Sequence, residues 1–377
     1  MAAEIVIIGS GFAARQLVKQ LRQVDSSLAI RLIAADSCDD YSKPELSHVF
    51  SRGIPANALT QLSAQDFAER NRLILHPYTR VNRIDTVGHI VETDKGAFPY
   101  KKLVLATGAT AIRPAIAGNE LMFTLNSQQE YRLAESALRD ARRILLLGGG
   151  LIGTELAMDL NRAGKDVILA DRSSTLLASL MPAEISGRLQ AHLTRAGVRM
   201  MLSAELHSLR ADGSQLSASF QHHEPVNCDA VICAIGLRPE TALAQRTGLT
   251  TQRGIVVGAD LATSDPDIYA LGDCAEIAGK HLPFLQPAQL SALILARILC
   301  GQPGQLQLPP MLVRVKTPDM PLHLAGDTTN PDLNWTMTFN RGGMIAKGCD
   351  KEGSLQAFVV SEDNMKLAFT LLKQLTL

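Results

Sequence analysis

The sequence predicts an α/β fold with two parallel-sheet domains, the second inserted in the first, followed by a small α+β domain. Three observations carry this prediction. An apolar strand, a glycine-rich turn and an amphipathic helix follow one another twice along the chain. The two copies lie too far apart for a solenoid repeat, so they indicate separate units. Residues 301–310, rich in glycine, proline and glutamine, mark a boundary before a last region of strand-like runs.

The glycine-rich turns have the spacing G-x-G-x-x-[AG] in a strand–turn–helix–strand context. The first consists of Gly9, Gly11 and Ala14, and the second of Gly148, Gly150 and Gly153. The elements predicted around them are strands at 5–8 and 28–35 with a helix at 12–24, and strands at 144–147 and 167–170 with a helix at 151–163. One such motif is weak evidence, but two in full context indicate two Rossmann-like dinucleotide-binding domains.

Each position of these motifs has a physical role. The first glycine permits a tight turn, the second lets the backbone approach a pyrophosphate, and the third position lets the helix pack close to the strand. The pyrophosphate then binds to unpaired N–H groups at the helix N-terminus. Asp36 and Asp171 follow the next strand of each unit, where a carboxylate accepts hydrogen bonds from ribose hydroxyls. Asp171 would repel a 2′-phosphate and so favours NADH over NADPH, although the adjacent Arg172 weakens this inference.

Two further segments end in turns of small residues. Residues 100–109 are predicted as a buried strand that leads into Thr107 and Gly108. Residues 267–275 are predicted as a short strand that leads into Gly272 and Asp273. A carboxylate at a strand end, with a glycine before it, suits a polyol hydroxyl better than a metal ion. Taken alone, Asp273 could equally be an ordinary helix cap.

Composition excludes several classes of protein. Lysine and arginine number 37, as do aspartate and glutamate, and this balance argues against nucleic-acid binding through bulk charge. The six cysteines form no C-x-x-C pair and no zinc-type cluster, so we expect no disulfide framework, no metal site and a reducing, cytoplasmic location. No apolar run reaches the ~18 residues of a spanning helix. The first apolar run ends in a glycine motif and is predicted as a strand, not a signal peptide.

These four motifs, in this order, resemble those of the two-dinucleotide-binding-domain flavoprotein oxidoreductases. The resemblance covers roughly residues 4–300. It implies tightly but non-covalently bound FAD on Gly9, Gly11, Ala14, Asp36, Lys43, Thr107, Gly108, Gly272 and Asp273. It implies NADH, as a substrate, on Gly148, Gly150, Gly153 and Asp171. The corresponding domains are an FAD-binding domain at 1–111 and 237–308, an NADH-binding domain at 112–236 and a C-terminal α+β domain at 309–377.

Two segments indicate one branch of this family more specifically: Tyr41-Ser-Lys-Pro-Glu-Leu-Ser47 and Leu312-Val-Arg-Val-Lys-Thr-Pro318. Both are similar to the NADH–rubredoxin reductase branch, and the likeness extends along the whole chain. It implies an oxidoreductase that acts on iron–sulfur proteins. The implied acceptor is a transient, electrostatically bound partner, either a rubredoxin or the rubredoxin centre of a flavorubredoxin that detoxifies nitric oxide without oxygen. No nucleic acid and no membrane are expected as partners.

No redox cysteine is predicted beside the flavin. Disulfide-reductase relatives carry a C-x4-C pair where this chain has Tyr41-Ser-Lys-Pro. Cys228 and Cys233 have that spacing but are predicted on opposite faces of one buried strand. Cys38, the nearest cysteine to the position used by peroxidase-type relatives, is predicted to be inert. The flavin must then pass electrons directly to an acceptor, and the protein supplies positioning and electrostatics.

Three side chains are the candidates for catalytic residues. Lys43 is predicted to place a cation near flavin N5 and to favour the reduced, anionic flavin. Arg314 and Lys316 are predicted to share one strand face, from which Lys316 could join Lys43 or merely lie at a sheet edge. Glu155 matches a glutamate that lies near the nicotinamide in relatives. On the sequence alone, Glu155 could equally face solvent on its helix.

The C-terminal region is predicted to hold strands at 311–315, 335–339 and 355–360 and a helix from 361 to about 375. Rubredoxins are typically acidic, so a basic docking face is expected. Any such patch must be local, and its candidate members are Lys43, Arg314, Lys316 and Lys347. Two alternatives stay open. One is an NADH reductase of another one-electron carrier, such as a free rubredoxin or a ferredoxin, and the other is a flavin-bound redox sensor without enzymatic activity.

Overall fold

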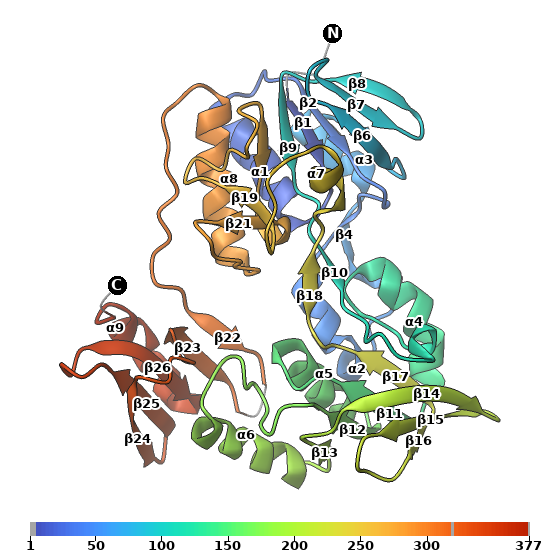
Figure 1. Cartoon of the computed structure of the whole chain (residues 1–377), viewed down its shortest axis with the longest axis vertical. Coiled ribbons are helices and arrows are strands. Elements are labelled where there is room, and N and C mark those ends of the chain that lie inside the picture. The colour runs from blue at the N-terminus through green and yellow to red at the C-terminus, as the bar shows by residue number, and fades with distance from the viewer. Residues whose placement is uncertain (1–4, 318–319, 376–377) are drawn as a thin grey trace. The chain divides into compact units, whose positions relative to one another are not determined.

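The computed structural model describes residues 5–317 and 320–375, which form two compact units (Figure 1). Unit 1 comprises Met1–Ser42, Thr60–Thr110 and Leu237–Leu308. Unit 2 comprises Lys43–Leu59, Ala111–Gly236 and Pro309–Leu377. The chain therefore enters each unit three times. Two short strands, β10 (Ala109–Ala111) and β18 (Leu237–Pro239), pair where the chain passes from one unit to the other.

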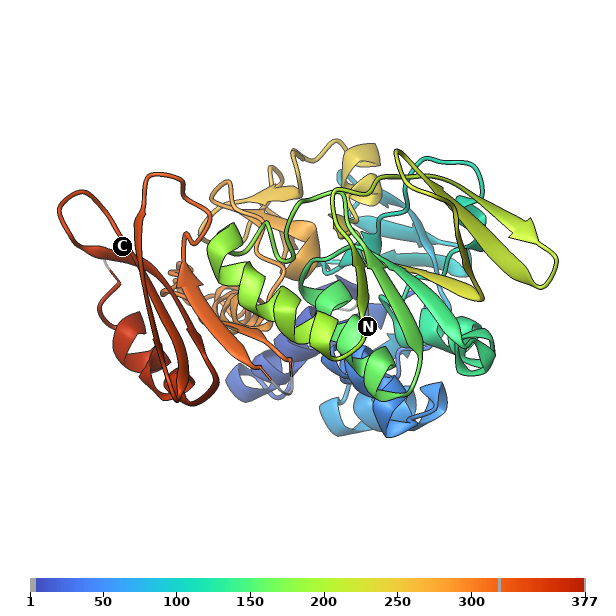
Figure 2. The same cartoon turned by 90° about the horizontal axis from the view of Figure 1, so that it is seen from below.

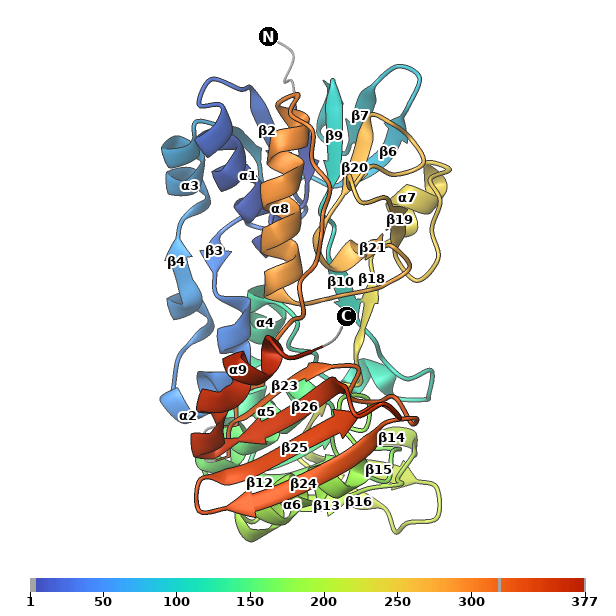
Figure 3. The same cartoon turned by 90° about the vertical axis from the view of Figure 1, so that its left-hand side faces the viewer.

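Unit 1 is built on a five-stranded, all-parallel sheet. Its strands, in spatial order, are β20 (Ile268–Ala270), β9 (Lys102–Leu105), β1 (Ile5–Ile8), β2 (Ile30–Ile33) and β5 (Ile74–His76). All four residues of β1 are buried, as expected for a central strand covered on both faces. Helices α1 (Phe12–Val24) and α8 (Leu285–Leu299) pack against each other (Figures 1 and 3). The predicted helix at 12–24 is confirmed, whereas the strand predicted at 28–35 is confined to β2.

Smaller elements complete unit 1. The three-stranded antiparallel sheet consists of β6 (Val81–Asp85), β7 (Ile90–Thr93) and β8 (Gly96–Pro99). Two strand pairs are β3 (Asp40–Tyr41) with β4 (Thr60–Leu62), and β19 (Ile255–Val257) with β21 (Ala275–Ile277). The short helical elements are α3 (Ala64–Asn71), α7 (Ala242–Arg246) and the 3₁₀ turn η4 (Gly272–Cys274).

Unit 2 contains a second parallel sheet with four strands. Their spatial order is β13 (Arg199–Met201), β12 (Asp166–Ala170), β11 (Arg143–Leu147) and β17 (Ala230–Cys233). Its helices are α2 (Val49–Arg52), α4 (Gln128–Asp140), α5 (Leu151–Arg162) and α6 (Ala183–Arg195), with 3₁₀ turns η1 (Lys43–His48), η2 (Ala56–Leu59) and η3 (Asn119–Leu121). An antiparallel sheet of β14 (Leu206–Asp212), β15 (Gln215–Phe220) and β16 (Val226–Cys228) accompanies it. The strand and helix predicted around the second glycine turn are confirmed to within one residue.

The prediction that Cys228 and Cys233 share one strand is wrong. Cys228 ends β16 and Cys233 ends β17, and these strands belong to different sheets. Asp229 separates them, because its carboxylate accepts hydrogen bonds from the backbone N–H groups of Arg142 (2.9 Å) and Arg143 (2.7 Å). Both cysteines are nevertheless buried, as expected.

The C-terminal part of unit 2 is a five-stranded antiparallel sheet. Its spatial order is β22 (Val313–Val315), β23 (Leu322–Gly326), β26 (Leu355–Ser361), β25 (Gly343–Cys349) and β24 (Asn334–Asn340). The sequence predicted three of these strands and missed β23 and β25. The strand β22 ends at Val315, one residue before Lys316. Arg314 and Lys316 are both exposed and Val315 between them is buried, as expected for two residues on one face.

The single helix predicted from Ser361 to about Leu375 is also wrong. Ser361 still belongs to β26, and the chain continues as the 3₁₀ turn η5 (Glu362–Leu367) and the short helix α9 (Ala368–Leu372). Glu362 adopts a left-handed backbone with φ of 54°. Its carboxylate accepts from the Ser361 hydroxyl (2.8 Å) and from Arg188 of α6 (2.8 Å). These contacts hold Glu362 out of helical geometry, so a regular helix cannot begin there. Figure 2 shows α6 beside the C-terminal strands.

One glycine in α6 offers a test of helix stability. Gly187 is exposed in the middle of α6, and a Cβ there would meet no atom within 4 Å. We expect Gly187→Ala to stabilise the protein by about 0.5–1 kcal/mol, because alanine loses less backbone freedom on folding. Thermal denaturation measures the change. Gly164→Ala is the matched control: it also has open space, but its φ of +79° strains any other residue, so its melting temperature should fall. Equal shifts in the two variants would contradict the argument.

Candidate active site

The first glycine turn joins β1 to α1 and forms an open cradle. Gly9 has φ of +114°, and a Cβ there would lie 2.1 Å from the carbonyl oxygen of Ala106, so only glycine fits. Gly11 is the N-cap of α1, has no side-chain cap, and a Cβ there would meet nothing within 4 Å. Ala14, by contrast, is fully buried. The backbone of the turn is therefore packed closely at Gly9, whereas the N-terminus of α1 at Gly11 is accessible to an anion.

The second turn repeats this geometry in unit 2. Gly148 has φ of +107°, and a Cβ there would lie 2.4 Å from the carbonyl oxygen of Ala234. Gly150 is the N-cap of α5, again with open space and no side-chain cap. A Cβ on Gly153 would lie 1.8 Å from the carbonyl oxygen of Gly148. Even a methyl group is excluded there, which explains why the third position is glycine in this copy.

An aspartate is fixed beside each turn. Asp36 accepts from the Ser10 hydroxyl through both oxygens (2.7 and 2.8 Å) and from the Cys38 N–H (3.0 Å). Asp171 accepts from the backbone N–H of Gly149 (2.5 Å) and of Ser173 (2.6 Å). Both carboxylates thus lie where ribose hydroxyls are bound in such folds. Ser10, the residue between the two glycines, was missed by the sequence reasoning. Its position next to the motif was the available signal.

The other candidates of unit 1 gather at the same edge of its sheet. Thr107 and Gly108 follow β9, Gly272 and Asp273 follow β20, and the carboxyl ends of parallel strands share one edge. A Cβ on Gly272 would lie 2.6 Å from the Cβ of Ala13, so this turn lies against the first turn of α1. The short turn η4 has no side-chain cap, so the helix-cap alternative for Asp273 is not supported. These residues fit a dinucleotide laid across the edge.

Glu155 is buried in unit 2, which contradicts the alternative that it faces solvent. It is 5% exposed on α5. One carboxylate oxygen accepts from the Ser47 hydroxyl (2.8 Å) and the other from the backbone N–H of Lys316 (2.9 Å). His48 Nε2 lies 4.0 Å away. Glu155 therefore joins α5 to η1, which begins at Lys43, and to the segment after β22.

A second buried carboxylate extends this contact. Asp159, one turn beyond Glu155 on the same helix face, is 4% exposed and accepts from the backbone N–H groups of Phe50 (2.7 Å) and Ser51 (3.3 Å). The spacing of four residues places both acids on one face of α5, but the sequence does not show that this face is buried. Nothing in the sequence identified Ser47 or His48 as their neighbours.

The cysteines nearest to the glycine cradle of unit 1 are held as neutral thiols. Burial raises the pKa of Cys38 to about 12, with a further contribution from Asp36. Burial also raises the pKa of Cys274. Because the thiolate is the reactive form, these environments give no support to a redox cysteine. Within residues 5–317 and 320–375, no group of three or more metal-ligating side chains occurs, and no helix is long and apolar enough to cross a membrane.

The candidate basic residues of the C-terminal sheet are only partly brought together. Arg314 on β22 and Lys347 on β25 point to the same face, as the strand registers require. His323 lies between them on this face, and burial, followed by repulsion from Arg314, lowers its pKa. Lys316 is exposed beyond the end of β22.

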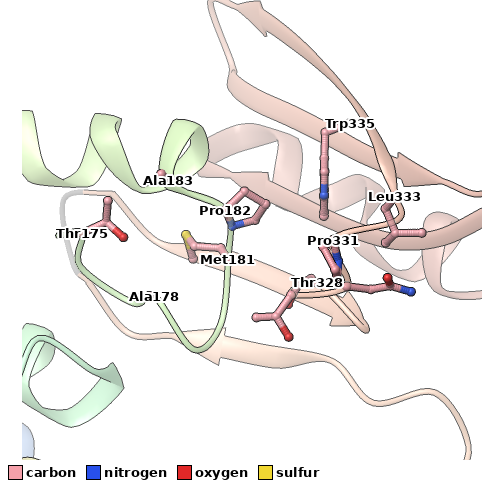
Figure 4. A pocket seen from close by; sticks show the side chains of 11 residues that line it. Thr175, Ala178, Met181, Pro182, Ala183, Thr328, Pro331, Leu333 and Trp335 are labelled. Atoms are coloured by element: carbon pink, nitrogen blue, oxygen red, sulfur yellow. The ribbon is translucent and has the colours of Figure 1, made fainter. Parts of the chain in front are cut away.

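A pocket of about 310 Å³ lies elsewhere in unit 2 (Figure 4). It is lined by the segment before α6 and by residues 328–335, including Met181, Pro182, Leu333 and Trp335. The Thr328 hydroxyl, at its margin, donates a hydrogen bond to the Leu180 carbonyl. None of its lining residues is charged.

Comparison with known proteins identifies the family. Residues 3–292 match the family described as "Pyridine nucleotide-disulphide oxidoreductase". The chain belongs to this family. Residues 305–375 match the "Rubredoxin binding C-terminal domain". The predicted α/β fold and the resemblance to flavoprotein oxidoreductases of the rubredoxin reductase branch are thereby confirmed, and the chain is an oxidoreductase.

Individual relatives agree with this assignment. The chain is 56% identical, over 375 residues and the full length of both chains, to proteins named "Nitric oxide reductase FlRd-NAD(+) reductase" from Escherichia coli O157:H7 and Shigella sonnei. Two solved structures share the fold. A ferredoxin reductase from Rhodopseudomonas palustris has a TM-score of 0.90 at 24% identity, covering 99% of this chain and 96% of that one. An NADH:rubredoxin oxidoreductase from Clostridium acetobutylicum has a TM-score of 0.83 at 21% identity, covering 99% and 95%.

Proposed function

We propose that this chain passes electrons from NADH, through bound FAD, to the rubredoxin centre of a flavorubredoxin that reduces nitric oxide. The observation that carries the proposal is the presence in one chain of two dinucleotide cradles and a C-terminal segment that matches a rubredoxin-binding domain. The name of the 56%-identical relatives supports the same acceptor. The six cysteines form no C-x-x-C pair and no disulfide framework is expected, which supports a cytoplasmic location.

The residues of unit 1 fit FAD and those of unit 2 fit NADH. FAD would be held by Gly9, Gly11, Ala14, Asp36, Thr107, Gly108, Gly272 and Asp273. The resemblance implies Lys43, which belongs to unit 2, as a further contact. NADH would be held by Gly148, Gly150, Gly153 and Asp171. When bound, FAD accepts an electron pair as hydride and releases electrons one at a time, as an iron centre requires. We assign the FAD-binding domain to 1–111 and 237–308, the NADH-binding domain to 112–236 and the C-terminal domain to 309–377.

The chain's own residues act by orientation and charge. Asp171 is fixed by two backbone N–H groups, and its carboxylate would repel a 2′-phosphate and favour NADH. Glu155 holds the backbone at Lys316 and the hydroxyl of Ser47, and thereby orients the segments that carry the cations Lys316 and Lys43. The two lysines would stabilise negative charge on the reduced cofactor.

Anaerobic stopped-flow spectroscopy tests the proposal. The purified protein is mixed with NADH or NADPH, and then with a rubredoxin domain. We expect NADH to bleach the flavin absorption rapidly, NADPH to do so slowly, and the reduced protein to reduce the rubredoxin iron quickly. Bleaching without electron transfer to rubredoxin would point to another acceptor. A purified protein that neither contains nor takes up FAD would overturn the proposal.

Reversing one charge tests the docking of the acceptor. Rubredoxins are typically acidic, so Lys316→Glu should lower the association rate with rubredoxin by roughly threefold or more at low salt and flatten its salt dependence. The side chain is exposed, and the contact with Glu155 uses only the backbone, so folding should be unaffected. Lys351→Glu makes the same charge change at another exposed position of the C-terminal domain. Identical salt dependence in both variants would remove Lys316 from the docking surface.

A further inference from the structure

Arg15 is a buried arginine next to the first glycine turn. It follows Ala14 on α1, and its side chain is 5% exposed. Arginine is almost never this deeply buried unless its charge is paired. Burial is the main cause that lowers the pKa of Arg15, and the charge of Asp40 opposes it. A buried guanidinium at this position therefore supplies hydrogen bonds or charge that an apolar side chain such as leucine could not.

The contacts of Arg15 fix the turn that follows Asp36. Nη2 donates a hydrogen bond to the carbonyl oxygen of Cys38, and Nε lies 3.3 Å from Oδ1 of Asp40. The guanidinium carbon lies 4.5 Å from the centre of the Phe67 ring, which is itself 1% exposed. One planar cation thus contacts a backbone carbonyl, a carboxylate and an aromatic face, a combination that lysine cannot reproduce.

The turn needs such support because its backbone is unusual. Cys38 has φ of 59°, in the left-handed region that non-glycine residues seldom adopt. Its N–H donates to Asp36 (3.0 Å) and its C=O accepts from Arg15, so both of its backbone groups are held. Asp36 is in turn held by Ser10, between the two glycines. Arg15, Cys38, Asp36 and Ser10 form a continuous network from α1 to the glycine turn.

One nitrogen of Arg15 makes no hydrogen bond in this network. Nη1 of Arg15 is buried and has no hydrogen-bond partner in the described part of the chain. A buried N–H of a charged group without an acceptor costs stability, so native proteins rarely contain one. The guanidinium is therefore kept at a cost in stability, and its other contacts hold the turn that follows Asp36.

We propose that Arg15 is the positioning residue for the adenosine half of FAD, because it holds the turn of residues 36–40, which carries Asp36. The proposal rests on the function proposed above, in which unit 1 binds FAD. It assigns Arg15 a role in affinity for the cofactor and none in electron transfer.

The test compares apoprotein variants by cofactor binding. Arg15→Met keeps the length of the side chain and removes its hydrogen bonds, and Arg15→Lys keeps the charge if the methionine variant does not fold. FAD should bind at least about tenfold more weakly to either variant, as loss of a charge-assisted hydrogen bond predicts. The affinity for FMN, which lacks the adenosine half, should not change.

A second readout follows the turn itself. In the wild-type apoprotein the buried thiol of Cys38 should react slowly with a maleimide at pH 8, since its pKa is raised to about 12. Labelling of the Cys38 peptide, followed by mass spectrometry, should be faster in both Arg15 variants. Arg22→Met is the matched control, because Arg22 also lies on α1 and donates to the backbone carbonyls of Leu28 (2.8 Å) and Arg72 (2.9 Å). It should change neither FAD affinity nor Cys38 labelling.

The outcomes separate the two proposals. If the wild-type apoprotein binds FAD but the Arg15 variants bind FAD as tightly, the role of Arg15 is refuted and the proposed function stands. If FMN affinity falls as much as FAD affinity, Arg15 only maintains the fold, and the inference is again overturned. If the wild-type apoprotein binds no FAD, the proposed function itself fails.

Discussion

Replacing Gly153 with alanine is expected to abolish rapid reduction of the flavin by NADH while leaving FAD bound. The added Cβ would lie 1.8 Å from the carbonyl oxygen of Gly148, and neither atom belongs to a flexible side chain. To relieve the clash, α5 must move away from β11, and this displaces Gly150 at the helix N-terminus. The predicted pyrophosphate site would then be lost. We expect kcat/KM for NADH to fall by roughly 100-fold or more, consistent with the cost of an unrelieved backbone overlap.

Two comparisons show whether the effect is local. Flavin content, measured by absorption, should be unchanged, since FAD is assigned to the turn at Gly9 in the other unit. Gly187→Ala makes the same chemical change within unit 2 but in open space, and should reduce the flavin at the wild-type rate. Gly153→Ala with a normal rate of reduction by NADH would exclude the second turn from nucleotide binding.

The sequence predicted the parts of the fold that depend on local chemistry. A glycine turn imposes its geometry within a few residues: Gly9 and Gly148 have positive φ, and a Cβ at either would overlap a backbone carbonyl. The helix that follows each turn is therefore found within one residue of its predicted end. The same local pattern predicted an aspartate beside each turn, and in the structure Asp36 accepts from the Ser10 hydroxyl and Asp171 from the N–H of Gly149.

The parts that the sequence did not predict depend on contacts between distant segments. Glu155 accepts from Ser47 and from the backbone at Lys316, which are more than a hundred residues away on either side. No periodicity within α5 could distinguish such a buried acid from a solvent-exposed one. The C-terminal helix was mispredicted for a similar reason, because Arg188 holds Glu362 from another element. The break at Asp229 likewise arises from N–H groups at the start of β11.

Removing the carboxylate of Glu155 is expected to destabilise the protein. In Glu155→Ala, the backbone N–H of Lys316 loses its acceptor, whereas the Ser47 hydroxyl can still donate to the Pro44 carbonyl (3.2 Å). We therefore expect a loss of about 1–3 kcal/mol in the free energy of unfolding, the cost of one unsatisfied group. Asp159→Ala removes the second carboxylate of α5 and leaves the N–H groups of Phe50 and Ser51 unpaired. Its cost in stability should be similar.

The Glu155→Gln variant distinguishes an effect of the carboxylate on stability from an effect of its charge on the reaction. Its carbonyl oxygen can still accept from Lys316, and its amide can donate to the Ser47 hydroxyl, which is able to act as an acceptor. The glutamine variant should therefore be nearly as stable as the wild type. If Glu155 serves only to join α5, η1 and the segment after β22, the glutamine variant should also reduce the flavin with NADH at the wild-type rate. If the negative charge beside His48 and Lys316 matters for the reaction, the rate should fall in Glu155→Gln and stay normal in Asp159→Ala. Loss of rate in Asp159→Ala as well would mean that the kinetic effect follows from stability alone.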